Sequence, residues 1–446
     1  MSGRRLLVLL IVLAAVALPA GVLRALCVGR SCEGSTETKT RIPFCSLPAG
    51  LRERIANGFR EGRSPDVLAV AGDTDVYTES GNLRLPWPAS GTSTDARVPL
   101  VFAGPGVDQH ARVPHGVTLD QVAPTVARLI GLERPFPGVR SGTAIDAVAA
   151  APSPNAGIER PALVLLVAWK GIGSAELEDL PGDWPFLSSL VDNGAGTLEA
   201  ETGSLPLDPA ATMTTIGTGG LPSQHGITGA SVRGDGGGVT PAFGAGAPVH
   251  IIATLADDLE EQEPGTLVGL VGTQDADRGL VGGGWYEGQD PVDVALGEPA
   301  AAVHAARTDL ATGYGKDDRT DVLGVALQGD VRRLDRWTER IVGSARSVTD
   351  GNLVVVVAGT GSWERSRLAI PDDRVVGEVE AAVPGARPVV AAEVAGGLFL
   401  DQAVLTEQAV TGQAVVDALL ETETPGGETM FEDAFQGFAV SFARYC

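Results

Sequence analysis

The sequence predicts an α/β protein with a parallel-rich sheet and helices on both faces. Short, continuous apolar runs bounded by turn residues recur along the chain, as in strands that are buried on both sides. Segments with helical periodicity lie between these runs, which is the alternation that builds a parallel sheet. With 446 residues, of which 44% are hydrophobic, the chain can bury a large core without a structural metal.

Two strands and two helices are expected in the first part of the globular chain. Val67–Ala71 and Val98–Phe102 are apolar runs that predict buried parallel strands. Leu47–Phe59 has helical spacing, and Leu119–Leu129 predicts a helix that ends at Gly131.

A Pro-, Ser- and Asn-containing linker at residues 151–160 precedes the second part, where strands and helices alternate. Strands are expected at Ala162–Ala168, Thr266–Val271, Asp321–Leu327 and Leu353–Val357, and helices at Pro185–Asn193, Ile251–Glu260 and Val331–Ser347.

The charge balance is strongly acidic. The formal net charge is −23, and lysine occurs only at positions 39, 170 and 316. Because neutralising phosphates requires clustered Lys and Arg, this composition argues against nucleic acid or an anionic membrane surface as a partner.

The N-terminus carries targeting information. Arg4 and Arg5 precede the apolar stretch Leu6–Leu23, which is long enough for a signal peptide and at the short limit for a transmembrane anchor. Residues 1–26 are therefore expected to be a signal peptide or a membrane anchor, and both place the body outside the cytoplasm. Membrane contact is expected through this segment only.

Four cysteines also fit an oxidising, extracytoplasmic compartment. Cys27, Cys32 and Cys45 lie close together in sequence, and Cys446 is the last residue, so three pairings are open. Their spacing lacks the paired C-x-x-C motifs of structural zinc sites.

One stretch carries a family resemblance. Thr212–Gly229 reads TMTTIGTGGLPSQHGITG and resembles the signature that follows the nucleophile in the alkaline phosphatase superfamily, in its type I phosphodiesterase and phosphate-irrepressible alkaline phosphatase branch. The matching positions are Thr218, Gly219, Pro222, His225, Gly226, Ile227 and Gly229. The resemblance implies an alkaline phosphatase-like core, whose family members are zinc-dependent hydrolases.

The catalytic positions implied by this resemblance are substituted. Pro209 occupies the place of the nucleophile, although it has no hydroxyl group and cannot attack phosphorus. Ala230 replaces a phosphate-contacting Asn, and Lys170 replaces the metal-binding Asp of the opening strand. Where relatives have D-H-G, the strand at Leu353 ends in Gly359 and Thr360.

Two further motifs are altered, and one is lost. The words DADRGLVGGG resemble the K-D-R-G motif, with Ala276 for Lys but with Asp277 and Arg278 retained. The D-x-x-G-H metal loop is deleted after Asp330, and the G-T-x-H-G word at residues 91–95 has no His. Two-metal phosphoryl transfer needs about six nitrogen and oxygen ligands, so no zinc cofactor is expected here.

The order of the matching words is permuted. Residues 46–150 resemble the C-terminal segment of the family fold, and residues 161–446 resemble its N-terminal segment. Residues 27–45 form a polar, Cys-containing linker. If the two ends are adjacent in the fold, a Cys45–Cys446 disulfide is expected, with Cys27 and Cys32 paired locally or free. The pairings Cys27–Cys446 and Cys32–Cys446 stay open as alternatives.

The sequence therefore suggests a non-catalytic, alkaline phosphatase-like protein of the cell envelope that acts by binding an envelope partner or an anionic ligand. The remnant cleft would be formed by Arg278, Asp277, Lys170 and Thr212. Lys170 is expected either to replace the lost metal charge, with a carboxylate within about 4 Å, or to reach solvent. The alternative function is a metal-dependent phosphatase or phosphodiesterase with an unrecognised site.

Other candidates have simpler interpretations. Asp73 and Asp75 follow a strand and suggest a cation site or, more simply, a solvated turn. Thr212, Thr214 and Thr215 have no recognisable base that would activate their hydroxyl groups as nucleophiles. His110 and His115 are expected at the surface, and the Gly282–Gly284 and Gly236–Gly238 runs are expected to be turns.

Overall fold

The computed structural model describes residues 44–71, 76–78, 96–149, 160–362, 368–370, 373–423, 426–442 and 446. The predicted signal peptide or anchor, Cys27, Cys32 and most of the polar linker lie outside these ranges. Asp73, Asp75 and residues 91–95 lie outside them as well. Within the described ranges, no helix combines the length and apolar character needed to cross a bilayer.

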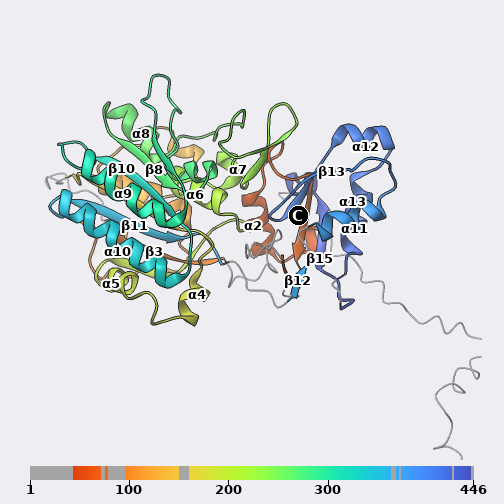
Figure 1. Cartoon of the computed structure of the whole chain (residues 1–446), viewed down its shortest axis with the longest axis horizontal. Helices are drawn as coiled ribbons and strands as arrows, with labels where there is room; N and C mark the ends of the chain where they lie inside the picture. The colour runs from red at the N-terminus through yellow and green to blue at the C-terminus, as the bar shows by residue number, and fades with distance from the viewer. Residues whose placement is uncertain are drawn as a thin grey trace, which may run out of the picture. The chain divides into compact units, whose positions relative to one another are not determined.

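A seven-stranded sheet forms the centre of the larger part of the molecule (Figure 1). Its order is β5 (Ala195–Glu201), β3 (Arg97–Ala103), β11 (Leu353–Gly359), β4 (Leu163–Trp169), β10 (Asp321–Leu327), β8 (Val268–Gly272) and β9 (Asp293–Leu296). The strands β11, β4, β10, β8 and β9 are mutually parallel. This arrangement confirms the parallel-rich sheet that the sequence predicts.

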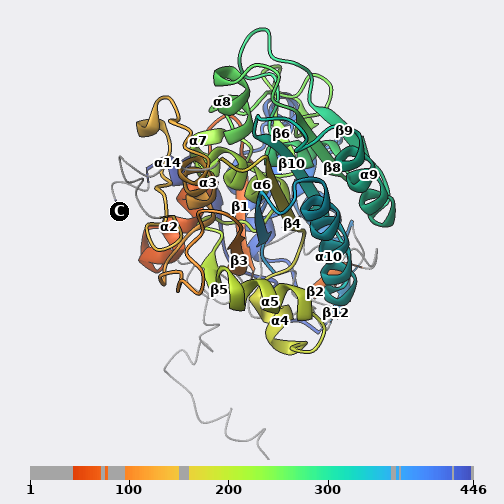
Figure 2. The ribbon, with the colours of Figure 1, turned by 90° about the vertical axis from the view of Figure 1, so that its left-hand side faces the viewer.

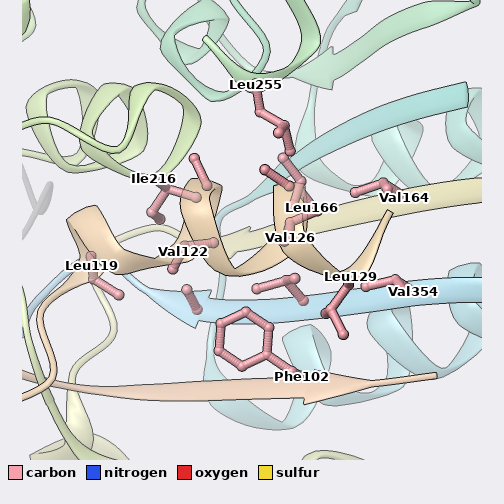
Figure 3. Packing of buried hydrophobic residues seen from close by; sticks show 14 of the residues in the cluster. Phe102, Leu119, Val122, Val126, Leu129, Val164, Leu166, Ile216, Leu255 and Val354 are labelled. Carbon is pink, nitrogen blue, oxygen red and sulfur yellow. The ribbon is translucent and has the colours of Figure 1, made fainter. Parts of the chain in front are cut away.

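Helices cover both faces of this sheet, because successive residues of its central strands point to opposite faces and are apolar on both. On β4, Val164, Leu166 and Ala168 face one core, and Leu163, Leu165, Val167 and Trp169 face the other. The first core is closed by α3 (Val122–Leu129), α6 (Pro209–Thr218) and α8 (Leu255–Gln262), as Figure 3 shows around Val126 and Leu166. The second is closed by α4 (Ser174–Asp179), α5 (Pro185–Asn193), α9 (Pro299–Thr312) and α10 (Val331–Val348).

The two strands predicted in the first part are antiparallel, so that part of the prediction is wrong. β3 runs antiparallel to both β11 and β5. β1 (Val67–Ala71) lies outside the large sheet and is antiparallel to both of its neighbours. A continuous apolar run reports burial of both strand faces and leaves strand direction undetermined.

β1 belongs to a second, four-stranded sheet that the sequence does not predict. Its order is β13 (Val390–Val394), β14 (Gly397–Leu400), β1 and β15 (Phe431–Gln436). One face packs on α11 (Arg374–Ala382), α12 (Gln402–Gln408) and α13 (Gly412–Leu420). The other packs on α2 (Ala49–Gly58) and α14 (Phe438–Ser441). Residues from near both chain ends thus share one small sheet.

A disulfide joins these two ends. Cys45 and Cys446 are bonded, with Cα atoms 5.1 Å apart across a sequence separation of 401. The rings of Phe44 and Phe435 pack beside this junction with centroids 5.1 Å apart. The predicted pairing is confirmed, and the competing pairings of Cys446 are wrong.

Helix α8 begins four residues later than predicted, at Leu255 instead of Ile251. The Thr254 side chain accepts a hydrogen bond from the Asp257 amide, and the Asp257 side chain accepts one from the Thr254 amide. This capping box fixes the first turn. The predicted helix at Leu119 begins as a 3-10 turn, η3 (Leu119–Gln121), before α3 continues it.

The remaining elements are short. They are the 3-10 turns η2 (Phe44–Ser46), η4 (Pro137–Val139) and η5 (Asp275–Leu280), the helix α7 (Pro222–His225), the hairpin of β6 (Ser231–Arg233) and β7 (Val239–Pro241), and the parallel pair β2 (Val76–Thr78) and β12 (Leu368–Ile370).

Candidate functional site

The carboxyl edge of the large sheet brings several of the predicted site residues together. Lys170 directly follows β4, Gly359 ends β11, and Thr360 follows it. Thr273 follows β8. Because these strands are parallel, their carboxyl ends share one edge, the place where α/β sheets carry functional groups.

Lys170 is buried in an ion pair at this edge. Its Nζ lies 2.7 Å from Asp277 Oδ1, and the two side chains are 2% and 0% exposed. The same ammonium group donates a hydrogen bond to Thr273 Oγ1 at 2.8 Å. The prediction of a carboxylate within about 4 Å of this ammonium group is confirmed, and the solvent-exposed alternative is wrong.

The Asp277 carboxylate is also fully engaged. Its second oxygen accepts hydrogen bonds from the Thr273 amide at 2.8 Å, from the Thr273 hydroxyl at 3.2 Å and from the Gln274 amide at 3.3 Å. Buried charges persist in proteins when they are paired and hydrogen-bonded in this way. The ion pair is therefore a closed unit that spans β4 and the turn after β8.

Thr360 links the edge to helix α6. Its hydroxyl accepts a hydrogen bond from the Gly171 amide at 2.9 Å, and its carbonyl oxygen accepts one from the Thr212 hydroxyl at 3.5 Å. Gly359 is required sterically, because a Cβ atom there would lie 2.3 Å from the Ile172 carbonyl oxygen. Thr360 thus connects Gly171, the neighbour of Lys170, to Thr212 on α6 through two hydrogen bonds.

The N-terminus of α6 is occupied by the carboxylate of Asp208, a side chain of the same protein. Asp208 caps the helix: one oxygen accepts from the amides of Ala210 and Ala211, at 2.8 and 3.4 Å. The other accepts from the Ala230 amide at 3.0 Å. Pro209 occupies the first helical position, where its missing N–H costs nothing. A helix N-terminus favours anions, and here the anion belongs to the chain itself.

Thr215 lies beside an imidazole, a contact that the sequence did not predict, but this imidazole is not a base. The Ile227 amide donates to His225 Nδ1 at 3.1 Å, so Nε2 carries the proton and donates to Thr215 Oγ1 at 3.1 Å. Burial, followed by the charge of His250, lowers the pKa of His225 well below its ordinary value. Thr214 donates to a carbonyl of its own helix. None of these threonines is activated.

The buried neutral His225 predicts a pH dependence of stability. The pKa of His225 is lowered on folding, so below about pH 6.5 the unfolded chain binds a proton here that the folded chain does not. The contribution of His225 to the free energy of unfolding is therefore fully present above that pH and is lost as the pH falls. Lowering the pH from about 6.5 to 5 should reduce the free energy of unfolding by at most about 1.6 kcal/mol through this residue. Urea unfolding at both pH values measures the loss.

His225→Gln should remove this dependence, whereas His115→Gln, at an exposed position, is the matched control and should keep it. The pH interval lies above the range in which ordinary carboxylates titrate. An equal loss of stability in wild type and His225→Gln would contradict the assignment.

Arg278 and Gln274, at the turn η5, each have a buried nitrogen donor. Arg278, on η5, is half-buried, and its Nε has no hydrogen-bond partner among the described residues. Gln274, just before the same turn, has a buried Nε2 in the same condition. Two buried donors on one turn therefore lack acceptors.

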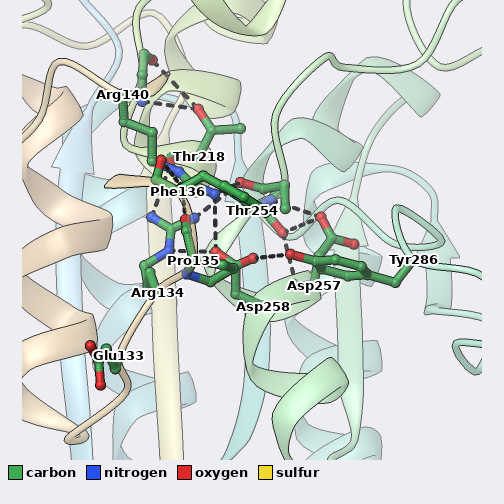
Figure 4. Close-up of polar contacts among 12 residues, drawn as sticks. Glu133, Arg134, Pro135, Phe136, Arg140, Thr218, Thr254, Asp257, Asp258 and Tyr286 are labelled. Carbon is green, nitrogen blue, oxygen red and sulfur yellow. Dashed lines mark hydrogen bonds and ion pairs between the residues drawn. The ribbon is translucent and has the colours of Figure 1, made fainter. Parts of the chain in front are cut away.

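A buried arginine network was not predicted (Figure 4). Arg134 Nε and Arg140 Nη2 lie 2.7 and 3.1 Å from the same Asp258 oxygen. Both arginines also donate to the Thr218 carbonyl at the end of α6, and Tyr286 donates to Asp258. Burial, followed by the charge of Arg140, lowers the pKa of Arg134 to about 10. The network joins the segment after α3 to α6 and α8.

A second unpredicted group surrounds His250. Its Nε2 lies 3.2 Å from Asp257 Oδ2, and its ring packs against Phe243 and Trp285. Asp257 also accepts from Thr254. The only sequence signal was the Thr-x-x-Asp capping pattern before α8.

The two histidines that were expected at the surface are exposed. His110 is exposed and contacts the Asp192 carbonyl through Nδ1 at 2.6 Å, and His115 is exposed. Gly282, Gly283 and Gly284 lie in irregular backbone after η5 and all have positive φ values, 71°, 111° and 76°, which glycine adopts without strain. In the part of the chain that the structure describes, no group of three His, Cys, Asp or Glu side chains could hold a metal ion.

Fold and site together define an α/β protein with a seven-stranded and a four-stranded sheet and with a closed ion pair at the carboxyl edge of the larger one. No protein-family model matches the chain, and no curated protein matches it either. Among solved structures, wild-type alkaline phosphatase PafA is similar at 13% identity and a TM-score of 0.40, over 63% of this chain and 85% of that one. A four-substitution mutant of PafA is similar at the same identity and TM-score, over 63% and 86%.

Proposed function

We propose that this chain is a non-catalytic, alkaline phosphatase-like protein that acts by binding a partner in the cell envelope. The observation that carries the proposal is the Lys170–Asp277 ion pair, with a distance of 2.7 Å and side-chain exposures of 2% and 0%. It lies where the resemblance in sequence would put a metal ligand.

An ammonium group at this position is incompatible with a dinuclear metal centre. A second cation beside Lys170 Nζ would be repelled strongly in a buried, low-dielectric environment. The Asp277 oxygens are already occupied by Lys170, Thr273 and Gln274. Two-metal catalysis requires several unengaged carboxylate and imidazole ligands, so these contacts favour a binding function.

Asp208 makes a phosphate ligand at α6 equally unfavourable. Its carboxylate already uses the Ala210, Ala211 and Ala230 amides. A phosphoryl group would have to displace this buried side chain, and it would meet a like charge. The proposal therefore favours a macromolecular partner over an anion in the remnant cleft.

The same proposal includes a permuted domain order and an extracytoplasmic location. β3, from the segment 46–150, lies between β11 and β5, which come from the segment 161–446. The Arg134 and Arg140 contacts join the same two blocks. The Cys45–Cys446 bond favours an oxidising compartment. Residues 1–26 would provide the export signal or the anchor.

Anion binding is a second candidate because Arg278 and Gln274 both have buried donors without acceptors. A small oxyanion could accept both hydrogen bonds. Calorimetric titration with inorganic phosphate separates the two candidates.

The preferred function predicts no saturable binding of phosphate that depends on Arg278, so wild type and Arg278→Gln should behave alike. Arg319→Gln, at an exposed residue paired with Asp317, is the control for loss of one positive charge. Saturable binding that Arg278→Gln abolishes and Arg319→Gln retains would establish the anion candidate instead.

A further inference from the structure

The outer face formed by α9 and α10 contains a groove of about 800 Å³. The two helices lie side by side against the second core of the large sheet (Figure 2). The groove is lined by the C-terminal halves of both helices, which lead toward the amino ends of β10 and β11. It therefore lies apart from the carboxyl edge that carries Lys170.

The charge of the groove is opposite to that of the chain. Arg307 and Arg340 face it from the two helices, together with His304 and the hydroxyls of Ser344 and Ser347. No Asp or Glu of the described residues lines it, although the chain has 56 acidic and 33 basic residues. The groove is thus a local basic surface on an acidic protein.

Two carboxylates on these helices, those of Asp309 and Glu339, do not line the groove. Asp309 of α9 has Asp293 on β9 as its charged neighbour, and Glu339 of α10 has Asp335. Arg307 donates through Nε to Ser344 at 3.1 Å, which fixes its position between the helices. The side chain of Arg340 has no partner within the described ranges, so its guanidinium group is available.

Ordinary structural roles do not account for Arg340. Arg332 and Arg333, on the first turn of α10, are paired with Asp183 and Asp330. Arg340 lies more than two turns before the end of the helix at Val348, so it cannot serve the helix dipole, whose effect is confined to the last turn.

Two local features of α10 are unfavourable for the helix itself. Arg336 and Arg340 are like charges at positions i and i+4, which destabilises a helix. Gly343 is exposed in the helix interior, and a Cβ atom there would meet nothing within 4 Å. Packing therefore does not require this glycine, and glycine weakens a helix interior relative to alanine. Such departures from local preference are expected at functional surfaces.

We propose that the groove between α9 and α10 binds an acidic polypeptide segment of a partner protein. The guanidinium groups of Arg307 and Arg340 would pair with carboxylates, and the hydroxyl of Ser347 would donate to them. The Ser344 hydroxyl already donates to the Arg340 carbonyl oxygen at 3.0 Å. Leu310, Ala311 and Val348 supply an apolar floor, and Gly343 keeps it accessible. A cavity of about 800 Å³ has room for several residues rather than for one small anion.

The test uses a fluorescein-labelled peptide of alternating Glu and Ala with the full chain, followed by fluorescence anisotropy at low and at physiological salt. The wild type should bind it saturably, and Arg307→Ala/Arg340→Ala should weaken binding by about tenfold or more. Gly343→Gln, which fills the groove without changing the charge, should weaken binding similarly. Arg319→Ala/Arg387→Ala removes two exposed, paired arginines elsewhere and should retain binding within about twofold.

Equal weakening in the groove and control variants would show non-specific attraction and would overturn the proposal. Absence of saturable binding at low salt would overturn it as well, as would a site that takes inorganic phosphate through Arg340 but not the peptide. Far-UV circular dichroism and urea unfolding of each variant separate loss of binding from loss of the fold. The result is independent of metal content and hydrolysis, so this inference and the proposed loss of catalysis can fail separately.

Discussion

Replacing Lys170 with methionine is expected to lower the free energy of unfolding by about 3–5 kcal/mol, because it leaves a buried carboxylate without its counter-charge. Asp277 is fully buried, and its Oδ1 atom is 2.7 Å from the lysine ammonium group. Methionine preserves most of the side-chain volume, so the loss reports the charge rather than a cavity. Urea unfolding at neutral pH, followed by circular dichroism, measures it.

The double variant Lys170→Met/Asp277→Leu should recover most of this loss. Replacing both members of a buried ion pair by apolar residues is often neutral, whereas removing one member is costly. The recovery gives the coupling between the two residues directly. The wild type and Arg319→Met, which removes an exposed cation paired with Asp317, provide the reference. If Lys170→Met unfolds within about 0.5 kcal/mol of the wild type, the closed ion pair is wrong.

Loss of the Cys45–Cys446 disulfide is expected to lower the free energy of unfolding by about 2–5 kcal/mol. The bond spans a sequence separation of 401, for which the chain-entropy model gives an upper value of about 6 kcal/mol. It holds Cys45, in the turn η2 that precedes α2, against Cys446, next to Phe44 and Phe435. Destabilisation should therefore begin at α2 and α14 and reach β1 and β15.

Three variants separate the bond from the individual side chains. Cys45→Ser, Cys446→Ser and the double variant should all lose the same free energy, since each removes the same covalent link. Dithiothreitol should destabilise the wild type by a similar amount and leave the double variant unchanged. Additive losses in the double variant, or a wild type that is insensitive to reduction, would contradict a stabilising disulfide.

Local patterns were enough to predict five of the seven strands of the large sheet, but they missed β5, β9 and the covering helix α9. The bounds of α5 and β10 agree fully with the sequence-based prediction, and α10 is one residue longer. β1 was found as an apolar run, but its partners β14 and β15 lie more than 300 residues away in sequence. Strand direction and sheet membership depend on these distant partners, which no local pattern specifies.

The candidate site was predictable to the extent that its chemistry follows from single residue types. A lone lysine after a buried strand needs a counter-charge, and Asp277 provides it. Asp208 before Pro209 is a helix-start signal, although its contact with the Ala230 amide depends on the fold. The two buried arginines on Asp258 have no sequence signature, because the partners come from separate segments.

The central claim, that the chain lacks two-metal phosphoryl-transfer chemistry, is tested most directly by metal analysis combined with an activity assay. The protein is purified from zinc-supplemented medium, its zinc content is measured by inductively coupled plasma mass spectrometry, and hydrolysis of p-nitrophenyl phosphate and bis-p-nitrophenyl phosphate is followed on the same sample. We expect less than stoichiometric zinc and no turnover above buffer. Stoichiometric zinc together with turnover that a chelator abolishes and added zinc restores would contradict it.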